Sequence, residues 1–310
     1  MTEKRLRILI ASSPRMGNTW LKSLLAYAYH VPPMDVPFEG PGLDPERVDF
    51  PDRDCVCHEH FYPHPKVLEA VRREKVHLIT LLRHPADAFY SLYCYCNRRS
   101  GHYGSKAGMA PLVGVPFSHE RVYQNMPRLM THSILGRMVA WRDAGWADGQ
   151  GPVEPGSGKA IPIRYEDLVL DTEPTLRRLT DRIQPVSREA LLRAIDSCRI
   201  DRMQTMNDEL AKLCRKGQAN QWKDVFDERH LEIMRQFAEP MRELGYSLAR
   251  PALEEREIAS LRRRLAEAAD ELARKDAELA ALRAREGGPP RTPDAPGPGQ
   301  AADALNRTAD

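Results

Sequence analysis

Short apolar runs alternate along the chain with longer amphipathic stretches. Three of the runs are bounded by polar or turn-forming residues and predict buried strands: 6–11, 76–82 and 160–163. Five stretches of helix-forming residues predict helices: 18–29, 85–97, 173–183, 188–197 and 228–244. A repeated order of strand and helix predicts an α/β protein with three layers, in which helices flank a mostly parallel central sheet. Ligands bind such sheets at the carboxyl ends of the strands.

Two other regions follow different patterns. Residues 103–157 are interrupted by Gly and Pro and predict a long irregular segment, which we expect to gate a binding pocket. Residues 252–286 contain no Gly or Pro and carry apolar residues at heptad spacing, with Lys275 as the one break: Ile258, Leu261, Leu265, Ala268, Leu272, Leu279 and Leu282. That spacing predicts a C-terminal coiled-coil helix, homodimeric or trimeric, although a single surface helix has a similar pattern.

These patterns divide the chain into three parts. Residues 1–250 form the α/β domain, residues 251–286 the C-terminal helix, and residues 287–310 a Pro- and Gly-rich tail that we expect to be disordered. The predicted coiled coil implies a homo-oligomer formed through residues 252–286.

Composition narrows the classes of function. The chain has 310 residues, of which 42% are hydrophobic, and its net charge is only +2. The overall charge therefore does not indicate a nucleic-acid partner, and any anion site must come from local clusters of Lys and Arg. Because the sequence has no signal-like start and no apolar stretch long enough to cross a bilayer, we expect a soluble, cytoplasmic protein without a membrane span.

The six cysteines raise the question of disulfides or a metal. In a chain without a secretion signal we expect reduced thiols. The residues that a zinc site could use lack the usual ligand spacing, so no metal is expected: Cys55, Cys57, His58, His60, Cys94 and Cys96.

The first basic cluster lies between the first predicted strand and its helix. Here Gly17 permits a tight turn, Asn18 and Thr19 supply side-chain donors, and Arg15 supplies charge. The start of the helix adds free backbone N–H groups, which suit a phosphate or a sulfate. The Gly-x4-Gly-Lys-[Ser/Thr] pattern of nucleoside triphosphate loops is absent, and an ordinary strand-to-helix turn is the alternative.

Two further clusters follow. Arg83 ends the second predicted strand, at the same edge of the sheet as the first loop, and Ser91 lies about two helical turns later. The third cluster, Arg215-Lys216-Gly217, brings cations and backbone donors together. The alternatives are a helix-capping Arg with a buried Ser and a solvated basic turn.

Together these motifs resemble the PAPS-dependent sulfotransferase family of the cytosolic type, including its bacterial members, over residues 5–248. PAPS is 3′-phosphoadenosine 5′-phosphosulfate. The 13–21 segment resembles the family's 5′-phosphosulfate loop, the 83–91 segment its 3′-phosphate motif and the 215–223 segment its Arg-Lys-Gly motif, and Arg164 to Leu168 matches a further landmark. The resemblance implies a P-loop-like fold and sulfuryl transfer from PAPS to a hydroxyl or amine of a small-molecule acceptor.

The resemblance also implies roles for individual residues. Arg15, Gly17, Asn18 and Thr19 hold the 5′-phosphosulfate, and Trp20 stacks on the adenine. Tyr165 contacts the adenosine, and the residues expected to bind the 3′-phosphate are Arg83, Ser91, Arg215, Lys216 and Gly217.

Catalysis needs a base for the acceptor proton and help for the leaving group. The family places its catalytic His between the first loop and the 3′-phosphate strand, where His60 fits best and His58 is the alternative. Arg15 stands where the family often has Lys, and because Arg keeps its proton its help must be electrostatic, with Lys22 as a further helper.

Three further points concern the oligomeric state and the class of function. The dimerisation motif of many cytosolic members is not recognisable in residues 223–232, so the C-terminal helix is expected to take its place. A phosphoryl-transfer enzyme is another alternative, but the sequence lacks the pair of magnesium ligands and the loop lysine that such an enzyme needs. The alternative function is a catalytically inactive scaffold that acts through the coiled coil.

Overall fold

The computed structural model describes residues 5–34, 48, 50–104, 108–206, 217–248, 261, 264–265, 268 and 271–279. These residues belong to two units, Met1–Ser260 and Leu261–Asp310.

A parallel sheet forms the centre of the first unit. Its four strands lie in the order β2-β1-β3-β4. They are β1 (Arg7–Ala11), β2 (Cys55–Glu59), β3 (His77–Leu82) and β4 (Ala160–Arg164). Leu9 of β1 pairs with Cys57 of β2 and with Leu78 of β3. The predicted α/β fold with a parallel sheet is confirmed, but β2 was not among the predicted strands.

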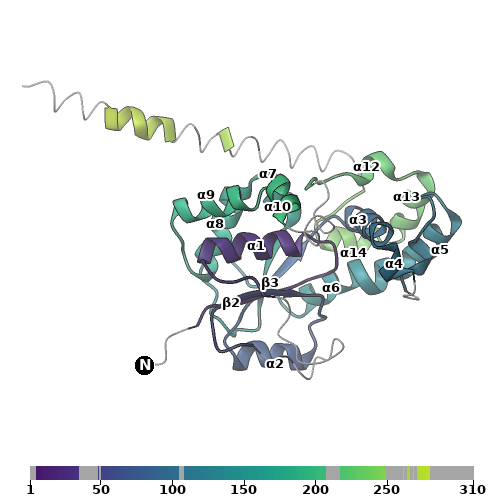
Figure 1. The fold of residues 1–310 in the computed structure, drawn as a ribbon, viewed down its shortest axis with the longest axis horizontal. Helices are drawn as coiled ribbons and strands as arrows, with labels where there is room; N and C mark the ends of the chain where they lie inside the picture. Colours follow the sequence, from purple (N-terminus) through teal and green to yellow (C-terminus); the bar gives the residue numbers. More distant parts are fainter. Residues whose placement is uncertain are drawn as a thin grey trace, which may run out of the picture. The chain divides into compact units, whose positions relative to one another are not determined.

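Helices cover both faces of this sheet, as in a three-layer fold (Figure 1). Helix α1 packs against α9, and α9 against α8, on one face, whereas α2 lies on the other. Outside the 103–157 segment, the described residues of this unit form α1 (Asn18–Tyr29), α2 (Pro65–Arg73), α3 (Pro85–Arg98), α4 (Ser100–Tyr103), α7 (Tyr165–Leu170), α8 (Thr172–Ile183), α9 (Arg188–Ser197), α10 (Ile200–Met206), α12 (Trp222–Val225), α13 (Glu228–Arg235) and α14 (Ala238–Glu243).

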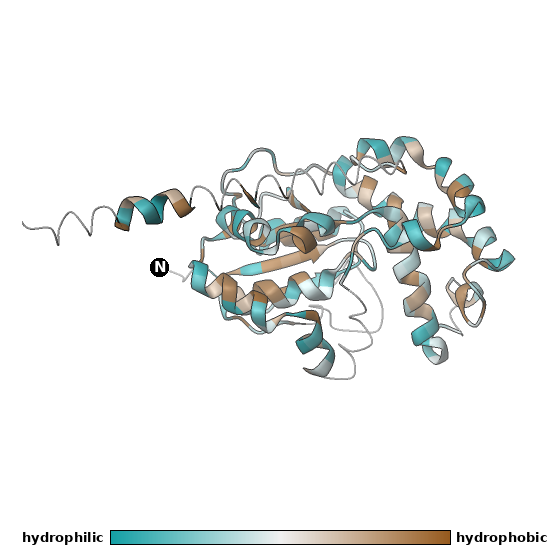
Figure 2. Cartoon of the chain, turned by 90° about the horizontal axis from the view of Figure 1, so that it is seen from above, coloured by the Kyte–Doolittle hydropathy of each residue, from teal (hydrophilic) through white to brown (hydrophobic). Residues whose placement is uncertain are grey.

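The sheet separates two apolar clusters because successive side chains of a strand point to opposite faces. Ile8 and Ile10 of β1 belong to the larger cluster, which includes Leu24 of α1. Leu9 belongs to the smaller cluster, which includes Val67 of α2. Figure 2 shows the strands in hydrophobic colours and the outer faces of the helices in hydrophilic ones.

The prediction of an irregular segment over residues 103–157 is wrong for its middle part. That part forms η2 (Ala110–Leu112), α5 (Glu120–Leu129), the π-helix η3 (Met130–Ile134) and α6 (Leu135–Asp143). Buried side chains recur at helical spacing here, including Val122, Met126 and Leu129, so packing overrides the Gly and Pro signals that flank them.

A further correction concerns the predicted helix over residues 228–244. It is two helices, α13 and α14, because the chain breaks its helical hydrogen bonding around Gln236 and Phe237.

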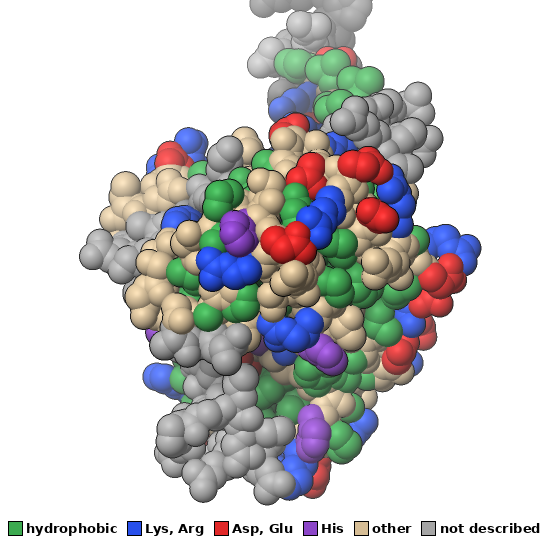
Figure 3. Space-filling view, turned by 90° about the vertical axis from the view of Figure 1, so that its right-hand side faces the viewer, with side chains coloured by type: hydrophobic (Ala, Val, Ile, Leu, Met, Phe, Trp, Pro, Cys, Tyr) green, Lys and Arg blue, Asp and Glu red, His purple; other side chains and the backbone are tan. Residues whose placement is uncertain are grey.

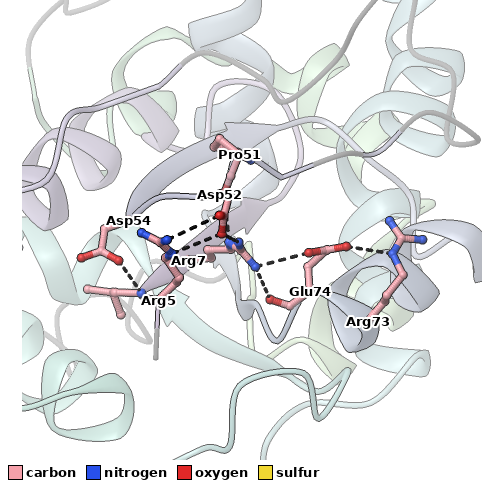
Figure 4. A network of polar contacts seen from close by, with 8 residues as sticks. Arg5, Arg7, Pro51, Asp52, Asp54, Arg73 and Glu74 are labelled. Atoms are coloured by element: carbon pink, nitrogen blue, oxygen red, sulfur yellow. Dashed lines mark hydrogen bonds and ion pairs between the residues drawn. The ribbon is translucent and has the colours of Figure 1, made fainter. Parts of the chain in front are cut away.

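A network of polar contacts joins the amino ends of the strands (Figure 4). Arg7 donates to the carbonyl oxygens of Pro51 (3.1 Å) and Glu74 (3.0 Å), and it forms ion pairs with Asp52 and Glu74. The backbone N–H of Leu6 donates to Asp54 (2.8 Å). These contacts tie β1 to the turns that precede β2 and β3.

The second unit is helical wherever the structure describes it. Its apolar residues are exposed: Leu261 (60%), Leu265 (73%), Leu272 (62%) and Leu279 (49%). A coiled coil would bury this seam, and its pairing stays a prediction. The predicted tail over residues 287–310 lies outside the described residues.

Surface and side-chain chemistry add three observations. Figure 3 shows basic and acidic side chains interspersed on the face in view. No helix among the described residues is both long and apolar enough to span a membrane, and no group of three or more potential metal ligands gathers there. The cysteines in this part of the chain form no disulfide with one another: Cys55, Cys57, Cys94, Cys96 and Cys198.

Candidate active site

A cavity of about 560 Å³ opens where the carboxyl ends of β1 and β3 meet the following loops. Its lining comes from all the predicted motifs that the structure describes, joined by the second half of α3 and the region between α9 and α10. The lining residues are Pro14, Arg15, Gly17, Asn18, Thr19, Trp20, His58, His60, Arg83, Ser91, Leu92, Tyr95, Arg99, Tyr103, Met109, Tyr165, Thr172, Ile195, Cys198, Arg199, Ile200, Gly217 and Gln221.

The loop after β1 has a backbone that only certain residues tolerate. Arg15 has φ +67° and Gly17 has φ +103°, both in the left-handed region. A Cβ atom on Gly17 would lie 2.6 Å from Cδ2 of Tyr165. Glycine is therefore required at this turn both for its conformation and for the close approach of the Tyr165 ring.

Buried hydrogen bonds hold this loop in place. Ser12 Oγ donates to Asn18 Oδ1 (2.6 Å), and Asn18 Nδ2 donates to the carbonyl of Ser13 (3.1 Å). The side chain of Asn18, predicted to contact the 5′-phosphosulfate, thus bonds within the loop, while its backbone N–H remains at the start of α1.

The π-helix η3 supports the site from a distant part of the sequence. Ser13 Oγ donates to the carbonyl oxygen of Ile134 (2.7 Å), and Tyr62 Oη donates to that of His132 (2.6 Å). One segment therefore anchors the loop after β1 and the chain that follows β2.

Two arginines, Arg15 and Arg83, supply guanidinium groups at the loop after β1. Arg15 Nε donates to Ser91 Oγ (3.2 Å), and its guanidinium lies 4.3 Å from the centre of the Tyr95 ring. Arg83 is buried and donates to the carbonyl oxygens of Arg15 (3.0 Å) and Gln218 (3.2 Å). Arg83 Nε is buried and has no hydrogen-bond partner among the described residues, which is unusual for a charged donor.

Aromatic rings form the neighbouring wall. The rings of Trp20 and Tyr165 meet edge to face with their centres 6.2 Å apart, and the Arg83 guanidinium lies 4.3 Å from the centre of Tyr165. Trp20 Nε1 donates to the carbonyl oxygen of Cys198 (3.0 Å), which fixes the indole plane. Burial raises the pKa of Tyr165 above its usual value, so its hydroxyl stays neutral.

His60 lies just beyond β2 with a defined ring orientation. Its Nδ1 lies 3.0 Å from the carbonyl oxygen of Ser12 and 3.3 Å from Nδ2 of Asn18. The shorter contact is a hydrogen bond only in the tautomer that carries the proton on Nδ1, because a carbonyl can only accept. Nε2 is then the unprotonated nitrogen. Burial lowers the pKa of His60 to about 4, so the ring is neutral at pH 7. His58 also lines the cavity, with its ring centre 6.0 Å from that of His60.

One predicted residue is absent from the cavity lining, and two others lie outside the described residues. Lys22 is buried, its ammonium donates to the carbonyl oxygen of Met34 (3.1 Å), and it is not among the lining residues. Its role in catalysis therefore stays a prediction without geometric support. Arg215 and Lys216 lie outside the described residues, and Gly217 is the first described residue after them.

Sequence reasoning missed Asp87, Tyr95 and Arg99. Tyr95 and Arg99 follow Ser91 at helical spacing of i+4 and i+8 on α3, so the helical period predicts that they share a face with Ser91. Asp87 follows Arg83 at i+4, a spacing typical of ion pairs, and its carboxylate lies 3.9 Å from Arg83.

The geometry of the cavity indicates a nucleotide-binding protein. Cationic side chains, a helix start with free N–H groups and an aromatic wall meet at the carboxyl edge of a parallel sheet. This arrangement suits a nucleotide with phosphate or sulfate groups.

Comparison with known proteins agrees with that class. A family model described as the sulfotransferase domain matches residues 5–247, so the chain belongs to the sulfotransferase family, whose reaction is sulfuryl transfer. The fold is similar to that of mouse sulfotransferase SULT7A1 complexed with PAP, with a TM-score of 0.56 and 16% identity over 82% of this chain and 89% of that one. It is also similar to retinol dehydratase in complex with androsterone and the inactive cofactor PAP, with a TM-score of 0.50 and 13% identity over 80% and 84% of the two chains. The comparison with curated proteins gives no match.

Proposed function

We propose that this sulfotransferase transfers the sulfuryl group of PAPS to a hydroxyl group of a small-molecule acceptor, by in-line displacement with His60 as the general base. The observation that carries the proposal is the meeting of His60, Arg15 and Arg83 in one cavity, with His60 Nδ1 3.0 Å from the Ser12 carbonyl oxygen and Arg83 Nε buried without a hydrogen-bond partner among the described residues. An amine acceptor needs the same base and is the variant of this reaction that the site also suits.

The residues present fit the donor. Arg83 and Ser91, with Arg215, Lys216 and Gly217, would hold the 3′-phosphate, and the buried Nε of Arg83 has a donor to offer it. Arg15, Thr19 and the backbone around Gly17 and Asn18 would hold the 5′-phosphosulfate. Trp20 and Tyr165 would contact the adenosine.

The transfer step assigns a task to each reacting group. His60 Nε2 takes the acceptor proton as the acceptor oxygen forms its bond to sulfur, and the bond from sulfur to the 5′-phosphate oxygen breaks. Arg15 stabilises the negative charge that develops on the departing phosphate oxygen by electrostatics alone, since its guanidinium keeps its proton at neutral pH. The Ser12 carbonyl holds His60 in the tautomer that this task requires.

The acceptor side of the cavity is aromatic and apolar. Leu92, Tyr95, Tyr103 and Met109 line it, and the Tyr95 and Tyr103 ring centres lie 5.4 Å apart. Such a wall suits an acceptor with an apolar body and a reactive hydroxyl.

Calorimetry with adenosine 3′,5′-bisphosphate (PAP), the product of PAPS, tests this proposal. The native chain should bind, and Arg83→Ala should lower the affinity about ten- to a hundredfold, because a charge-assisted hydrogen bond to a phosphate is lost. Arg98→Ala is the matched control, because Arg98 is an exposed arginine at the end of the helix that follows Arg83 and lies outside the cavity; this variant should bind like the native chain.

A folded native chain that does not bind would reject the proposal. That result would favour the alternative function, a catalytically inactive scaffold that acts through its C-terminal helix, whose leucines are exposed.

A further inference from the structure

Asp87 is a buried carboxylate in the first turn of α3 that takes no part in the reaction described above. Only 1% of its surface is exposed. Its Oδ2 accepts a hydrogen bond from the backbone N–H of Asn220 (2.5 Å), and its Oδ1 accepts one from that of Trp222 (2.9 Å). A carboxylate this close to a phosphate site needs an explanation, because it repels the phosphate.

The two donors belong to the segment that carries the third predicted motif. Residues 217–222 reach the cavity with Gly217 and Gln221. The segment has two left-handed residues, Gly217 (φ +63°) and Asn220 (φ +65°), so its path does not follow from regular secondary structure. Its shape must therefore be maintained by contacts with the rest of the protein.

Those contacts come from residues 83–87. Arg83 donates to the carbonyl oxygen of Gln218 (3.2 Å), and the His84 ring stacks on that of Trp222 with the centres 4.8 Å apart. Asp87 adds the two bonds to backbone N–H groups. Among these attachments only Asp87 bonds the segment at two separate amides.

We propose that Asp87 is a positioning residue that docks residues 217–222 onto the 3′-phosphate subsite, so that recognition of the 3′-phosphate depends on a carboxylate that does not touch it. This inference rests on the proposed function. The direction of the change in affinity distinguishes this role from a purely electrostatic one. If Asp87 acts only by its charge, removing the carboxylate relieves repulsion of the phosphate and strengthens binding. If Asp87 docks the segment, removing the carboxylate releases the segment and weakens binding. The docking effect is the larger one, because two charge-assisted bonds in a buried site are lost or weakened together.

The test compares two nucleotides that differ by the 3′-phosphate. Calorimetry measures the affinity of PAP and of adenosine 5′-phosphate for the native chain, Asp87→Asn and Asp87→Glu. Asp87→Asn should weaken PAP about tenfold or more and leave adenosine 5′-phosphate within about twofold, since only the 3′-phosphate subsite is disturbed. Asp87→Glu keeps the charge but is longer by a methylene group, so it displaces the segment and should act in the same direction.

Asp224→Asn is the matched control. Asp224 is an exposed acid on α12, just after the docked segment, so this variant removes the same charge without touching the bonds of Asp87. Its affinities for both nucleotides should equal those of the native chain.

Three results would overturn the inference while leaving the proposed function intact. One is unchanged or tighter PAP binding in Asp87→Asn, another is a parallel loss of both nucleotides, and the third is native behaviour of Asp87→Glu. A native chain that binds neither nucleotide would instead reject the proposed function and the recognition role with it.

Amide hydrogen exchange keeps the docking itself testable if a variant is unstable or binds nothing. The amides of Asn220 and Trp222 should exchange faster in Asp87→Asn than in Asp224→Asn, and equal exchange rejects the docking.

Discussion

At the scale of single residues, the proposed role of His60 depends on one hydrogen bond. When Nδ1 donates its proton to the Ser12 carbonyl, Nε2 keeps its lone pair and can take the proton of the acceptor. Burial lowers the pKa of the ring to about 4, which keeps it in the basic form at neutral pH.

This pKa predicts the pH dependence of the enzyme. A base must be unprotonated, so kcat/KM should stay level from pH 8 down to about pH 5 and fall below that, whereas an ordinary histidine would begin to lose activity near pH 6.5. His60→Gln should lower kcat about 10²- to 10⁴-fold and leave PAP affinity unchanged. A steady-state pH profile and calorimetry measure both. A profile that falls already at pH 6.5, or full activity in His60→Gln, would identify another base.

Gly17 gives a second prediction at this scale. Gly17→Ala places a Cβ 2.6 Å from the Tyr165 ring on a backbone with φ +103°, so it should abolish PAP binding and lower the melting temperature. Gly149→Ala is the control, since Gly149 has φ +68° with open space around it and reports the conformational cost alone, about 1 kcal/mol. Calorimetry and thermal melting distinguish the two. Native PAP affinity in Gly17→Ala would show that the ring moves aside without consequence.

Many site residues could be predicted from the sequence because of where they stand. Arg15, Gly17, Arg83 and Ser91 follow strands that the apolar runs mark clearly, and the carboxyl ends of parallel strands meet at one edge. Lys22 shows the limit of this reasoning: it lies in the adjacent helix, but its ammonium is held by the carbonyl of Met34. Spacing along a sequence does not tell which way a long side chain turns.

At the scale of elements, the π-helix η3 is the segment on which two parts of the site depend. Its carbonyl oxygens accept hydrogen bonds from Ser13, in the loop after β1, and from Tyr62, in the chain that follows β2 and His60. Wider helical turns of this kind recur at functional sites because they free carbonyl groups from the regular ladder.

Gly136 makes this π-helix sensitive to a single methyl group. A Cβ there would lie 1.8 Å from the carbonyl oxygen of Thr131, so Gly136→Ala should force the segment out of its π geometry. We expect a lower melting temperature and PAP binding weakened about tenfold, as the Ser13 bond is lost. The control is Gly101→Ala in α4, where a Cβ has nothing within 4 Å and the melting temperature should not fall. Unchanged PAP binding in Gly136→Ala would separate η3 from the site.

The elements that the sequence did not predict were missed for two different physical reasons. Strand β2 has the sequence Cys-Val-Cys-His-Glu, whose polar end interrupts the apolar run that would predict a strand. Its pairing with β1, which the sequence pattern does not show, stabilises it as a strand. Helices α5 and α6 flank a π-helix, and that shift in period disturbs the spacing by which an amphipathic helix is found. The strongly apolar strands β1 and β3 and the helix α1 needed no such help.

At the scale of the whole molecule, the exposed leucines of the second unit predict self-association. Removing residues 252–310 should reduce the solution mass to that of a monomer, because the heptad seam is lost. Light scattering measures the mass, and replacing Leu265 and Leu272 by Glu in the full chain should have the same effect. Replacing the exposed Lys275 by Leu is the opposite change and should strengthen association. An oligomer that persists after truncation would place the interface in the α/β domain.

The polar network at the amino ends of the strands has a consequence for how such a chain diversifies. Arg7 and its partners fasten β1 to the turns before β2 and β3, whereas the cavity occupies the opposite ends of the same strands. Residues that line the cavity can therefore be substituted while the contacts of Arg7 at the amino ends of the strands preserve the sheet. Directed evolution toward new acceptors should accordingly tolerate many substitutions at Leu92, Tyr103 and Met109, and few at Arg7.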